Sequence, residues 1–288
     1  MTGCETLGCH VQNQYFYNIR IQRLEKLVII PTYNEKDNIV RILRAIFSLE
    51  QDFHVLVIDD NSPDGTASIV RQLQQVYPLQ LFLEERKGKL GLGTAYIHGF
   101  KWAVGKGYEY IFEMDADFSH NPADLKRLYQ ACKFQHADVA VGSRYVKGGG
   151  KVNWPWDRIL LSKGASIYTR LITWMPVKDS TAGFVCYKRN VLETINLDEI
   201  KFVGYAFQIE MKYAAWKLGF TIREVPIVFE DRQHGVSKMN KGIVKEGILG
   251  VLQLRWYSMF KDYRNRLKKT EIHLFTPVEE EVFAKTKQ

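Results

Sequence analysis

The sequence predicts an α/β protein with a mostly parallel central sheet that is covered by helices on both faces. Short apolar runs alternate with longer segments in which apolar residues recur every three or four positions, as in strand–helix crossover units. The chain has 288 residues, enough for one large α/β domain or two smaller ones. Its 46% hydrophobic and 25% charged residues are typical of a globular protein and argue against disorder.

The regular alternation lies in the first half of the chain. Buried strands are predicted at residues 27–30, 54–58, 79–83, 108–114 and 138–141. Helices are predicted between them, at residues 38–47, 67–76, 94–104 and 123–134. Because strands and helices alternate, we expect crossover connections and parallel pairing.

The second half of the chain is less regular. It predicts helices at residues 157–174 and 206–218 and strands at residues 183–188 and 221–230, after a flexible loop of three glycines at 148–150. We expect one main domain over residues 26–240. Residues 1–25 form an N-terminal extension without a clear period, and residues 269–288 form a polar tail.

Charge and cysteine content narrow the class of protein. The net charge of +8 favours anionic partners, such as nucleotides, phosphates, acidic lipids or nucleic acid. The four cysteines show no C-x-x-C spacing, which argues against a zinc site or a disulfide framework and suits a reducing compartment. No apolar run approaches the ~18 residues of a membrane span, and polar residues interrupt any signal-peptide core near the N-terminus. We therefore expect a cytoplasmic protein, soluble or peripheral at a membrane.

The strongest chemical signal is the pair Asp115 and Asp117, separated by Ala116. Both carboxylates follow the apolar residues 110–112, at the carboxyl end of a predicted buried strand, where parallel sheets bind ligands. Two such carboxylates form a hard anionic site that suits Mg²⁺ or Mn²⁺, and the cation would also hold substrate phosphates. An arbitrary D-x-D is a solvated loop about as often as a metal site. Here a helix begins just beyond, which favours the metal site.

Two further strands end in polar residues at the same predicted edge. Residues 31–35 read Pro-Thr-Tyr-Asn-Glu, and residues 59–66 read Asp-Asp-Asn-Ser-Pro-Asp-Gly-Thr. The second segment alone could be a turn and a helix cap. Together the three strand ends predict a nucleotide pocket, in which Tyr33 stacks on a base while Glu35 and Asp60 accept hydrogen bonds. The chain lacks G-x-G-x-x-G after its first strand and lacks G-x-x-x-x-G-K-[ST], which excludes a Rossmann dinucleotide site and a P-loop.

Seven segments along the chain resemble those of family 2 glycosyltransferases, and more narrowly the dolichyl- and polyprenyl-phosphate mannosyltransferases. Three of them have been described: residues 31–35, residues 59–66 and the segment of Asp115 and Asp117. The other four are residues 88–96, 142–145, 178–184 and 229–239. The resemblance covers roughly residues 26–240 and implies a GT-A-like nucleotide-sugar transferase fold. It also implies an inverting transfer of mannose from GDP-mannose to a polyprenyl (dolichyl) phosphate, with a β-linked product. The alternative within the same fold is UDP-glucose or another nucleotide sugar as the donor.

The resemblance implies roles for individual residues. The guanosine pocket would be lined by Pro31, Tyr33, Glu35, Ile58 and Asp60. The metal would be held by Asp115 and Asp117, with Ser119 where some relatives have a glutamine ligand. The donor site would include Ala116 between these aspartates. The phosphates would be bound by Arg144, Arg232 and Lys238, which together with Asp117 form the catalytic set.

Two implied sites leave alternatives open. Glu210 lies where glycan-elongating relatives place a catalytic acid, but a solvent-facing acid or an ion pair explains it about as well. The glycine-rich segment at residues 88–93 precedes a helix and could cradle a phosphate, although a plain turn into that helix is equally consistent.

The chemistry of the acceptor predicts a site without a general base. An acceptor hydroxyl has to lose a proton to a base. A lipid phosphate monoester already carries about −1.5 to −2 charges at neutral pH and can attack the anomeric carbon directly. We therefore expect metal, Arg and Lys to position and neutralise two phosphates.

Residues 241–268 predict a basic amphipathic helix. Its apolar stripe recurs every three or four positions, at Val244, Ile248, Leu252, Trp256, Phe260, Tyr263 and Leu267. Residues 238–269 contain nine Lys or Arg and two acidic residues. Such a helix suits a membrane interface, whereas packing against the core explains the stripe about as well. Many relatives carry transmembrane helices and this chain shows none. We expect attachment to the cytoplasmic face of a membrane, directly or through a membrane-protein partner.

Two other functions are less consistent with the sequence. A nucleic-acid-binding protein would suit the charge and the aromatic residues, but no binding motif of the usual types occurs and the paired aspartates would have no role. A catalytically silent nucleotide-sugar-binding scaffold would not need Asp117, Arg232 and Lys238 together. We therefore expect an active enzyme and no nucleic acid partner.

Overall fold

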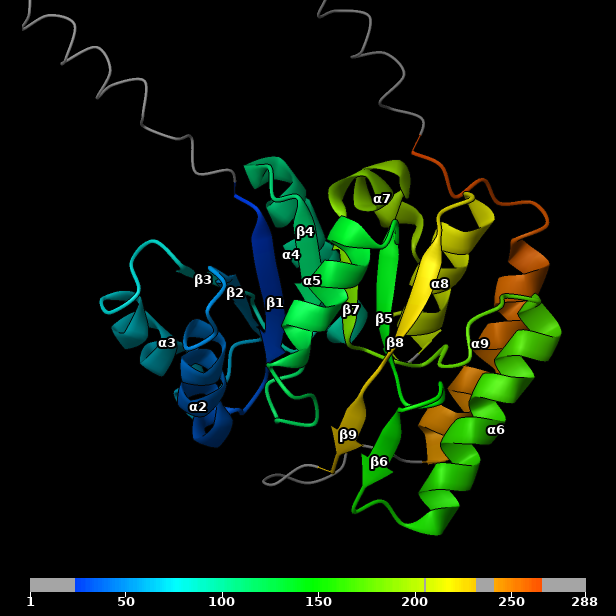
Figure 1. Ribbon diagram of the computed structural model, residues 1–288, viewed down its shortest axis with the longest axis horizontal. Helices are drawn as coiled ribbons and strands as arrows, with labels where there is room; N and C mark the ends of the chain where they lie inside the picture. Colours follow the sequence, from blue (N-terminus) through cyan, green and yellow to red (C-terminus); the bar gives the residue numbers. More distant parts are fainter. Residues whose placement is uncertain (1–23, 205, 232–240, 266–288) are drawn as a thin grey trace, which may run out of the picture.

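The computed structural model describes residues 24–204, 206–231 and 241–265 (Figure 1). Its centre is a seven-stranded sheet. The strands are β1 (Lys26–Thr32), β2 (His54–Asp59), β3 (Leu81–Glu85), β4 (Tyr110–Glu113), β5 (Val139–Ser143), β7 (Val185–Lys188) and β8 (Ile222–Pro226). In space they follow the order β3-β2-β1-β4-β7-β5-β8, and every pair is parallel except the two that β7 makes. The mostly parallel sheet confirms the predicted fold class.

Helices cover both faces of the sheet. One face packs against α2 (Lys36–Phe47), α3 (Thr66–Gln74) and α5 (Asp124–Phe134), and the other against α4 (Leu92–Lys106), α7 (Arg189–Thr194) and α8 (Ala206–Lys217). A short 3₁₀ helix, Leu197–Glu199, lies between α7 and α8. Along β1, Leu27 and Ile29 face the α4 side while Val28 and Ile30 face the α2 side. This strand is apolar on both faces because helices cover both.

The predicted strand at residues 221–230 is divided between two sheets. Its first part is β8, and its second part is β9 (Val228–Glu230), which pairs in parallel with β6 (Gly150–Val152). The predicted glycine loop at residues 148–150 therefore ends in a strand. Figure 1 shows β6 and β9 beyond the end of the main sheet, on the side where β1 ends.

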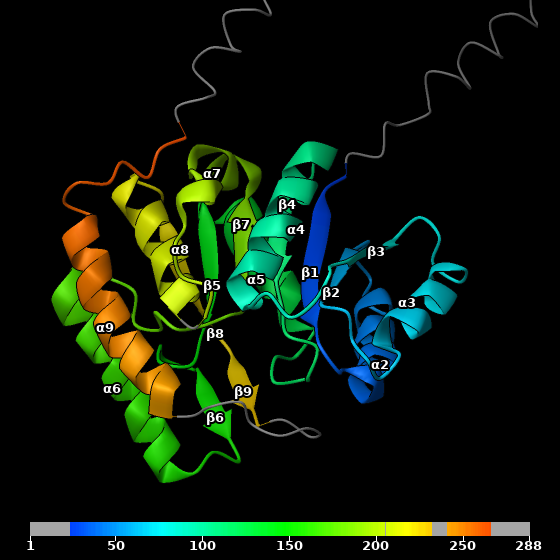
Figure 2. The same cartoon turned by 180° about the vertical axis from the view of Figure 1, so that it is seen from behind.

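Two long helices, α6 (Trp156–Thr173) and α9 (Lys241–Tyr257), lie side by side at one end of the molecule (Figures 1 and 2). The predicted helix at residues 241–268 is too long, because α9 ends at Tyr257. Beyond it the Ser258 hydroxyl donates to the Arg255 carbonyl at 2.8 Å and bonds to the Tyr213 hydroxyl at 2.8 Å. Tyr263 is 3% exposed and packs edge-on against Tyr213. The chain thus turns back onto α8.

Among the described residues, no helix combines the length and the apolar character that crossing a bilayer requires.

Candidate active site

The predicted strand ends do meet at one edge of the sheet. β2, β1 and β4 are neighbours and run in the same direction, so their carboxyl ends lie together. Just beyond each of them one residue adopts a left-handed backbone, with φ of 60° at Asn34, 57° at Asn61 and 60° at Phe118. Asparagine tolerates this conformation, whereas a bulky residue such as phenylalanine is strained in it. Strain of this kind persists where the surrounding structure enforces it, which is common at functional sites.

Asp59 joins the ends of β1 and β2. Its carboxylate accepts hydrogen bonds from the Thr32 hydroxyl at 2.8 Å and from the Ser62 backbone and hydroxyl at 2.9 and 2.6 Å. The Ser62 hydroxyl in turn accepts the Asn34 N–H at 3.0 Å. This network, which is buried at Asp59 and Thr32, connects the two turns that follow β1 and β2.

Asp64 holds the turn that follows Glu35. It accepts the Lys36 N–H at 3.0 Å and the Thr66 N–H at 3.0 Å. Burial acts to raise the pKa of Asp64, but the hydrogen bonds from Thr66 and Lys36 outweigh this effect and lower the pKa. The carboxyl group therefore stays ionised more readily than usual. Glu35 itself accepts the Asn38 side-chain amide at 2.9 Å.

Asp60 is held by an arginine that the sequence analysis did not single out. Arg86 donates from Nε to Asp60 Oδ1 at 2.6 Å, and the two side chains are only 8% and 10% exposed. Arg86 also donates to the Thr94 hydroxyl at 2.7 Å. Asp60 is therefore a fixed acceptor in an ion pair rather than an isolated carboxylate. Because Arg86 directly follows β3, the same strand-end rule that pointed to Asp60 would have found it.

The glycine-rich segment lies over the pocket. Lys89 places its Nζ 4.7 Å from the centre of the Tyr33 ring. The Gly93 N–H donates to the Val203 carbonyl at 2.8 Å, so this amide is not available to a phosphate. A Cβ at Gly93 would lie 2.8 Å from the Phe207 ring. These contacts favour the interpretation of residues 88–93 as a tightly packed turn into α4.

Pro31 and Ile58, both expected in the guanosine pocket, differ in exposure. Pro31 is half-buried at the end of β1. Ile58 has no exposed surface and belongs to the hydrophobic core on the α4 side, so its side chain does not line a pocket. Ile58 can contribute only through its backbone.

Asp115, Ala116 and Asp117 follow β4, as predicted. Asp115 is half-buried and Asp117 is 4% exposed. The Ser119 N–H donates to Asp117 Oδ1 at 3.0 Å. Burial, followed by the charges of both aspartates and of Glu113, raises the pKa of Tyr96 well above its usual value. Tyr96 is fully buried, and its hydroxyl has no hydrogen-bond partner among the described residues.

The oxygen atoms at this strand end suit a divalent cation. The Ser119 hydroxyl is buried and has no hydrogen-bond partner among the described residues, and it lies two residues after Asp117. Within the described ranges, no group of three His, Cys, Asp or Glu residues forms a complete protein-only metal site. Two carboxylates and a hydroxyl leave positions for phosphate and water, which is how Mg²⁺ is usually held.

Arg144 follows β5 at the same edge and is fixed by Asp179. Its Nε and Nη2 donate to the two carboxylate oxygens at 2.8 and 2.6 Å, and its backbone N–H donates to the same group at 2.9 Å. The side chains of Arg144 and Asp179 are 9% and 0% exposed. The guanidinium also lies 5.5 Å from the ring centres of both Trp154 and Phe229. Arg144 is thus an anchored residue and not a freely exposed one.

Residues 27–195 match the family described as glycosyl transferase family 2. The chain belongs to this family. A polyprenol monophosphomannose synthase from Mycolicibacterium smegmatis is 44% identical over 227 residues, which cover 79% of this chain and 85% of the relative. An undecaprenyl-phosphate mannosyltransferase from Micrococcus luteus is 41% identical over 241 residues, which cover 84% of this chain and 98% of the relative. The motif resemblance and the expectation of a glycosyltransferase are confirmed.

A solved structure confirms the fold of this glycosyltransferase. Glucosyl-3-phosphoglycerate synthase from Mycobacterium tuberculosis, in complex with Mn²⁺, UDP and glucosyl-3-phosphoglycerate, superposes with a TM-score of 0.60. The identity is 16%, and the alignment covers 82% of this chain and 81% of that chain. At this level of identity the likeness concerns the GT-A-like fold alone.

Further cations of this glycosyltransferase gather near Arg144. Burial, followed by the charge of Arg144, lowers the pKa of Lys151, and Lys163 adds to this effect while Asp179 opposes it. Arg158 pairs with Asp231 at 2.8 Å. This basic cluster, defined as Arg144, Lys151, Arg158 and Lys163, combines the end of β5 with β6 and α6. Arg232 and Lys238 lie outside the described residues.

Glu210 forms an ion pair, which was one of the alternatives for it. It is 1% exposed and lies 3.2 Å from Lys261 Nζ. Its Oε2 accepts the backbone N–H groups of Lys201 and Phe202 at 2.8 and 3.1 Å. These contacts assign Glu210 a role in holding the segment before α8.

Proposed function

We propose that this glycosyltransferase inverts the anomeric centre as it moves mannose from GDP-mannose to a polyprenyl (dolichyl) phosphate. The names of the two relatives support the mannosyl group and the class of acceptor. The structural observation that carries the proposal is the position of Asp115, Asp117 and Arg144 at one edge of the sheet. This edge combines an oxygen site for a cation with an anchored guanidinium for a phosphate.

His120 is buried on the segment that carries the paired aspartates. Its ring stacks on Phe184 at 4.9 Å. Burial lowers the pKa of His120 to about 4, Arg144 adds to this effect, and Asp117 and Asp179 oppose it. His120 is therefore neutral at physiological pH, and the charge of the site comes from the neighbouring Asp, Arg and Lys residues.

A divalent cation, Mg²⁺ or Mn²⁺, would be held by Asp115 and Asp117, with the Ser119 hydroxyl as a direct or water-mediated ligand. When bound, it supplies Lewis-acid stabilisation of the diphosphate leaving group. The residues of the chain supply the rest. Tyr33, Glu35 and Asp60 orient the nucleotide, and Ala116 lies between the two aspartates. Arg144, Arg232 and Lys238 bind phosphates.

The basic cluster would attract the acceptor phosphate, whose dianionic charge allows direct attack on the anomeric carbon. No residue has to remove a proton from this acceptor. A direct displacement from the side opposite the leaving diphosphate converts an α-linked donor into a β-linked product. The contribution of the chain is orientation and charge neutralisation.

A donor panel tests the proposal and its alternative, UDP-glucose or another nucleotide sugar. GDP-mannose, GDP-glucose, UDP-glucose and UDP-mannose, each labelled in the sugar, are incubated with polyprenyl phosphate and Mn²⁺. We expect label in the lipid fraction from GDP-mannose. Asp117→Asn should lower this transfer by roughly a hundredfold or more, because it removes one cation ligand. Preferential labelling from a UDP-sugar would select the alternative.

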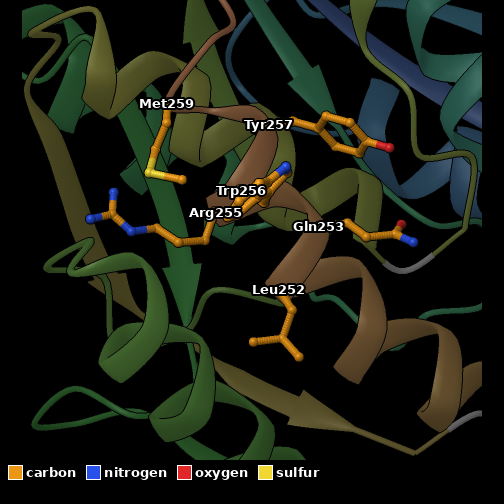
Figure 3. A pocket seen from close by; sticks show the side chains of 6 residues that line it. All are labelled: Leu252, Gln253, Arg255, Trp256, Tyr257 and Met259. Atoms are coloured by element: carbon orange, nitrogen blue, oxygen red, sulfur yellow. The ribbon is translucent and has the colours of Figure 1, made fainter.

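We also propose that the enzyme acts at the cytoplasmic face of a membrane through its two long helices. α6 exposes an apolar stripe made of Trp156, Leu160, Leu161, Ile167, Leu171 and Trp174. The α9 region exposes Leu249, Leu252, Trp256, Met259 and Phe260. Figure 3 shows the shallow pocket among residues 252–259, and Arg255 reaches from there to within 4.7 Å of the Trp174 ring. A patch of this kind suits the boundary between headgroups and acyl chains.

Core packing and membrane contact, the two interpretations of the predicted helix, would involve opposite faces of α9. Val251 and Leu254 are each 2% exposed and belong to the core. Leu252 and Trp256 are 46% and 63% exposed, and they point away from it. One face packs and the other is available to a membrane or to a membrane-protein partner.

Vesicle flotation tests this attachment. The double variant Leu252→Gln and Trp256→Gln should bind vesicles containing anionic lipid at least about tenfold more weakly, since burying each side chain contributes about 1.5–3 kcal/mol. The control is Val76→Gln and Leu79→Gln, whose side chains are 65% and 77% exposed elsewhere on the surface. Equal binding by the two double variants would contradict docking through α9.

A further inference from the structure

Lys212 is a fully buried cation for which the mechanism above has no use. It lies on α8 and has 0% exposed surface. Burial of an unpaired ammonium group is strongly unfavourable, so such a residue persists only where its donors and its charge are both satisfied.

All three donors of the Lys212 ammonium group are used. They bond to the Ala182 carbonyl at 2.6 Å, to the Gln208 carbonyl at 2.9 Å and to Gln208 Oε1 at 3.3 Å. Gln208 lies one turn earlier on the same helix. Ala182 belongs to a different part of the chain, the segment that leads into β7. Lys212 therefore ties α8 to this segment.

The charges around Lys212 come from both sides of the candidate active site. Burial lowers the pKa of Lys212 to about 8 and Arg144 adds to this effect, whereas Glu113, Asp179 and Glu224 oppose it. Glu113, which precedes the paired aspartates, is 0% exposed, and its carboxyl oxygens have no hydrogen-bond partner within the described ranges. Lys212 thus provides positive charge where buried carboxylates gather.

The segment from Lys178 to Ala182 is held at both ends. At its start, Glu224 accepts the N–H groups of Lys178 and Asp179 at 2.8 and 2.9 Å. At its end, Lys212 binds the Ala182 carbonyl at 2.6 Å. Asp179 belongs to the first of these two points, and its carboxylate binds Arg144 through three hydrogen bonds. The direction of the guanidinium therefore depends on how firmly this segment is held.

We propose that Lys212 is a positioning residue for the acceptor phosphate, acting through Ala182, Asp179 and Arg144. The inference rests on the proposed function, in which Arg144 binds that phosphate. A methionine would fill much the same volume as the lysine side chain but would leave the Ala182 carbonyl without its donor. The Asp179 carboxylate would then hold Arg144 less firmly, while the nucleotide pocket at β1 and β2 would be unchanged.

The test separates the two substrates kinetically. Lys212→Met should raise the KM for polyprenyl phosphate about tenfold, because a small misplacement of a binding group has large effects, and should leave the KM for GDP-mannose within about twofold. Lys217→Met is the matched control, since Lys217 is exposed at the end of the same helix. It should change neither constant.

A second variant separates positioning from stability. Burial raises the pKa of Glu113 to about 8 and Lys212 opposes this shift, so Lys212→Met leaves a buried carboxyl group without its nearby cation and should lower the Tm. Glu113→Gln combined with Lys212→Met removes both titratable groups and should recover much of the Tm, measured by differential scanning calorimetry. The KM for polyprenyl phosphate should stay raised in this folded double variant, because the bond to Ala182 is still missing.

The outcomes distinguish the inference from the proposed function. A normal KM for polyprenyl phosphate in the double variant, or an equal rise in both KM values, would overturn the positioning role of Lys212. If the wild-type enzyme does not label polyprenyl phosphate from GDP-mannose, the proposed function fails first, and the role of Lys212 toward this acceptor fails with it.

Discussion

Two arginine–carboxylate pairs near the end of β3 illustrate how burial sets the strength of an interaction. Arg86 pairs with Asp60, and the side chains are 8% and 10% exposed. Arg71 pairs with Glu85, and these side chains are 52% and 42% exposed. The chemistry is the same, but water screens only the second pair. Breaking a buried pair costs about 3–5 kcal/mol, whereas a surface pair contributes about 0–1 kcal/mol.

Arg86→Met should therefore destabilise the protein and weaken the binding of GDP at least about tenfold, because Asp60 loses the partner that orients it. Arg71→Met should change the free energy of unfolding by less than about 1 kcal/mol and leave GDP binding unchanged. Urea denaturation and titration calorimetry measure the two effects. Similar results for both variants would show that burial of the Arg86 pair has no special importance.

His54 makes the folded state sensitive to acid. Its Nδ1 lies 2.7 Å from the Tyr108 hydroxyl. Burial lowers the pKa of His54 from 6.5, Lys26 adds to this effect, and Asp52 opposes it. The folded state thus favours the neutral ring. Its contribution to stability is complete above pH 6.5 and is lost as the pH falls below that value, because the unfolded state then binds more protons.

We expect His54→Asn to reduce the fall in Tm as the pH is lowered below 6.5, since asparagine does not titrate there. A series of thermal melts at constant ionic strength measures it. A parallel fall in Tm for the wild type and the variant would assign the acid sensitivity to other groups.

At the scale of elements, α4 lies against the sheet and against the segment before α8 because two of its three glycines leave room for neighbouring atoms. A Cβ at Gly99 would lie 2.8 Å from Ile29 Cγ2, and a Cβ at Gly93 would lie 2.9 Å from the Phe202 carbonyl. At Gly105, in the last turn of the same helix, a Cβ would meet nothing within 4 Å. The absence of a side chain at Gly99 lets the helix approach β1, and its absence at Gly93 lets the helix approach the segment before α8.

Gly99→Ala should lower the free energy of unfolding by about 1–3 kcal/mol, the usual cost of overpacking. Gly105→Ala should be neutral or stabilise the protein by up to about 1 kcal/mol, because alanine has the higher helix propensity. Chemical denaturation at equilibrium compares them. Equal effects would indicate that α4 shifts freely to accommodate the extra methyl group.

A second element, β7, explains how the two halves of the site come together. It lies between β4 and β5 and is antiparallel to both, so the chain enters it from the edge where the other strands end. The segment that carries Asp179 therefore reaches Arg144 at the end of β5. A uniformly parallel sheet would place that segment at the opposite edge.

At the scale of the whole molecule, contacts connect the α9 region with the nucleotide pocket. Lys261, beyond the end of α9, pairs with Glu210 at 3.2 Å. Glu210 holds the backbone of Lys201 and Phe202, and the next carbonyl, that of Val203, accepts the Gly93 N–H at 2.8 Å. The proposed membrane-docking region and the donor side of the sheet are thus parts of one packed structure.

Binding of nucleotide and cation should stabilise this structure as a unit. A ligand at about a hundred times its Kd adds about 2.7 kcal/mol to the free energy of unfolding. We expect GDP with Mn²⁺ to raise the Tm, GDP with a chelator to raise it much less, and Asp117→Asn to abolish the difference. Differential scanning fluorimetry provides the measurement. An equal shift with and without the cation would contradict a metal site at Asp115 and Asp117.

The mostly parallel sheet and the position of the paired aspartates could be predicted from the sequence. Both follow from local information, because the spacing of apolar residues reflects the geometry of helices and strands, and because parallel strands end at a common edge. The motifs around Asp60, Asp117 and Arg144 were sufficient to identify the family. They did not reveal which charged groups pair with one another.

The pairing of these charged groups and the end of α9 depend on the tertiary structure. Arg86 reaches Asp60 across 26 residues, Arg144 reaches Asp179 across 35, and Lys212 reaches Ala182 across 30. No local pattern specifies such contacts, since the burial of a charged side chain depends on neighbours from distant parts of the chain. The same holds for Tyr263, which the helical period assigned to α9 but which packs on Tyr213 instead. Periodicity describes one element, whereas burial is a property of the assembled fold.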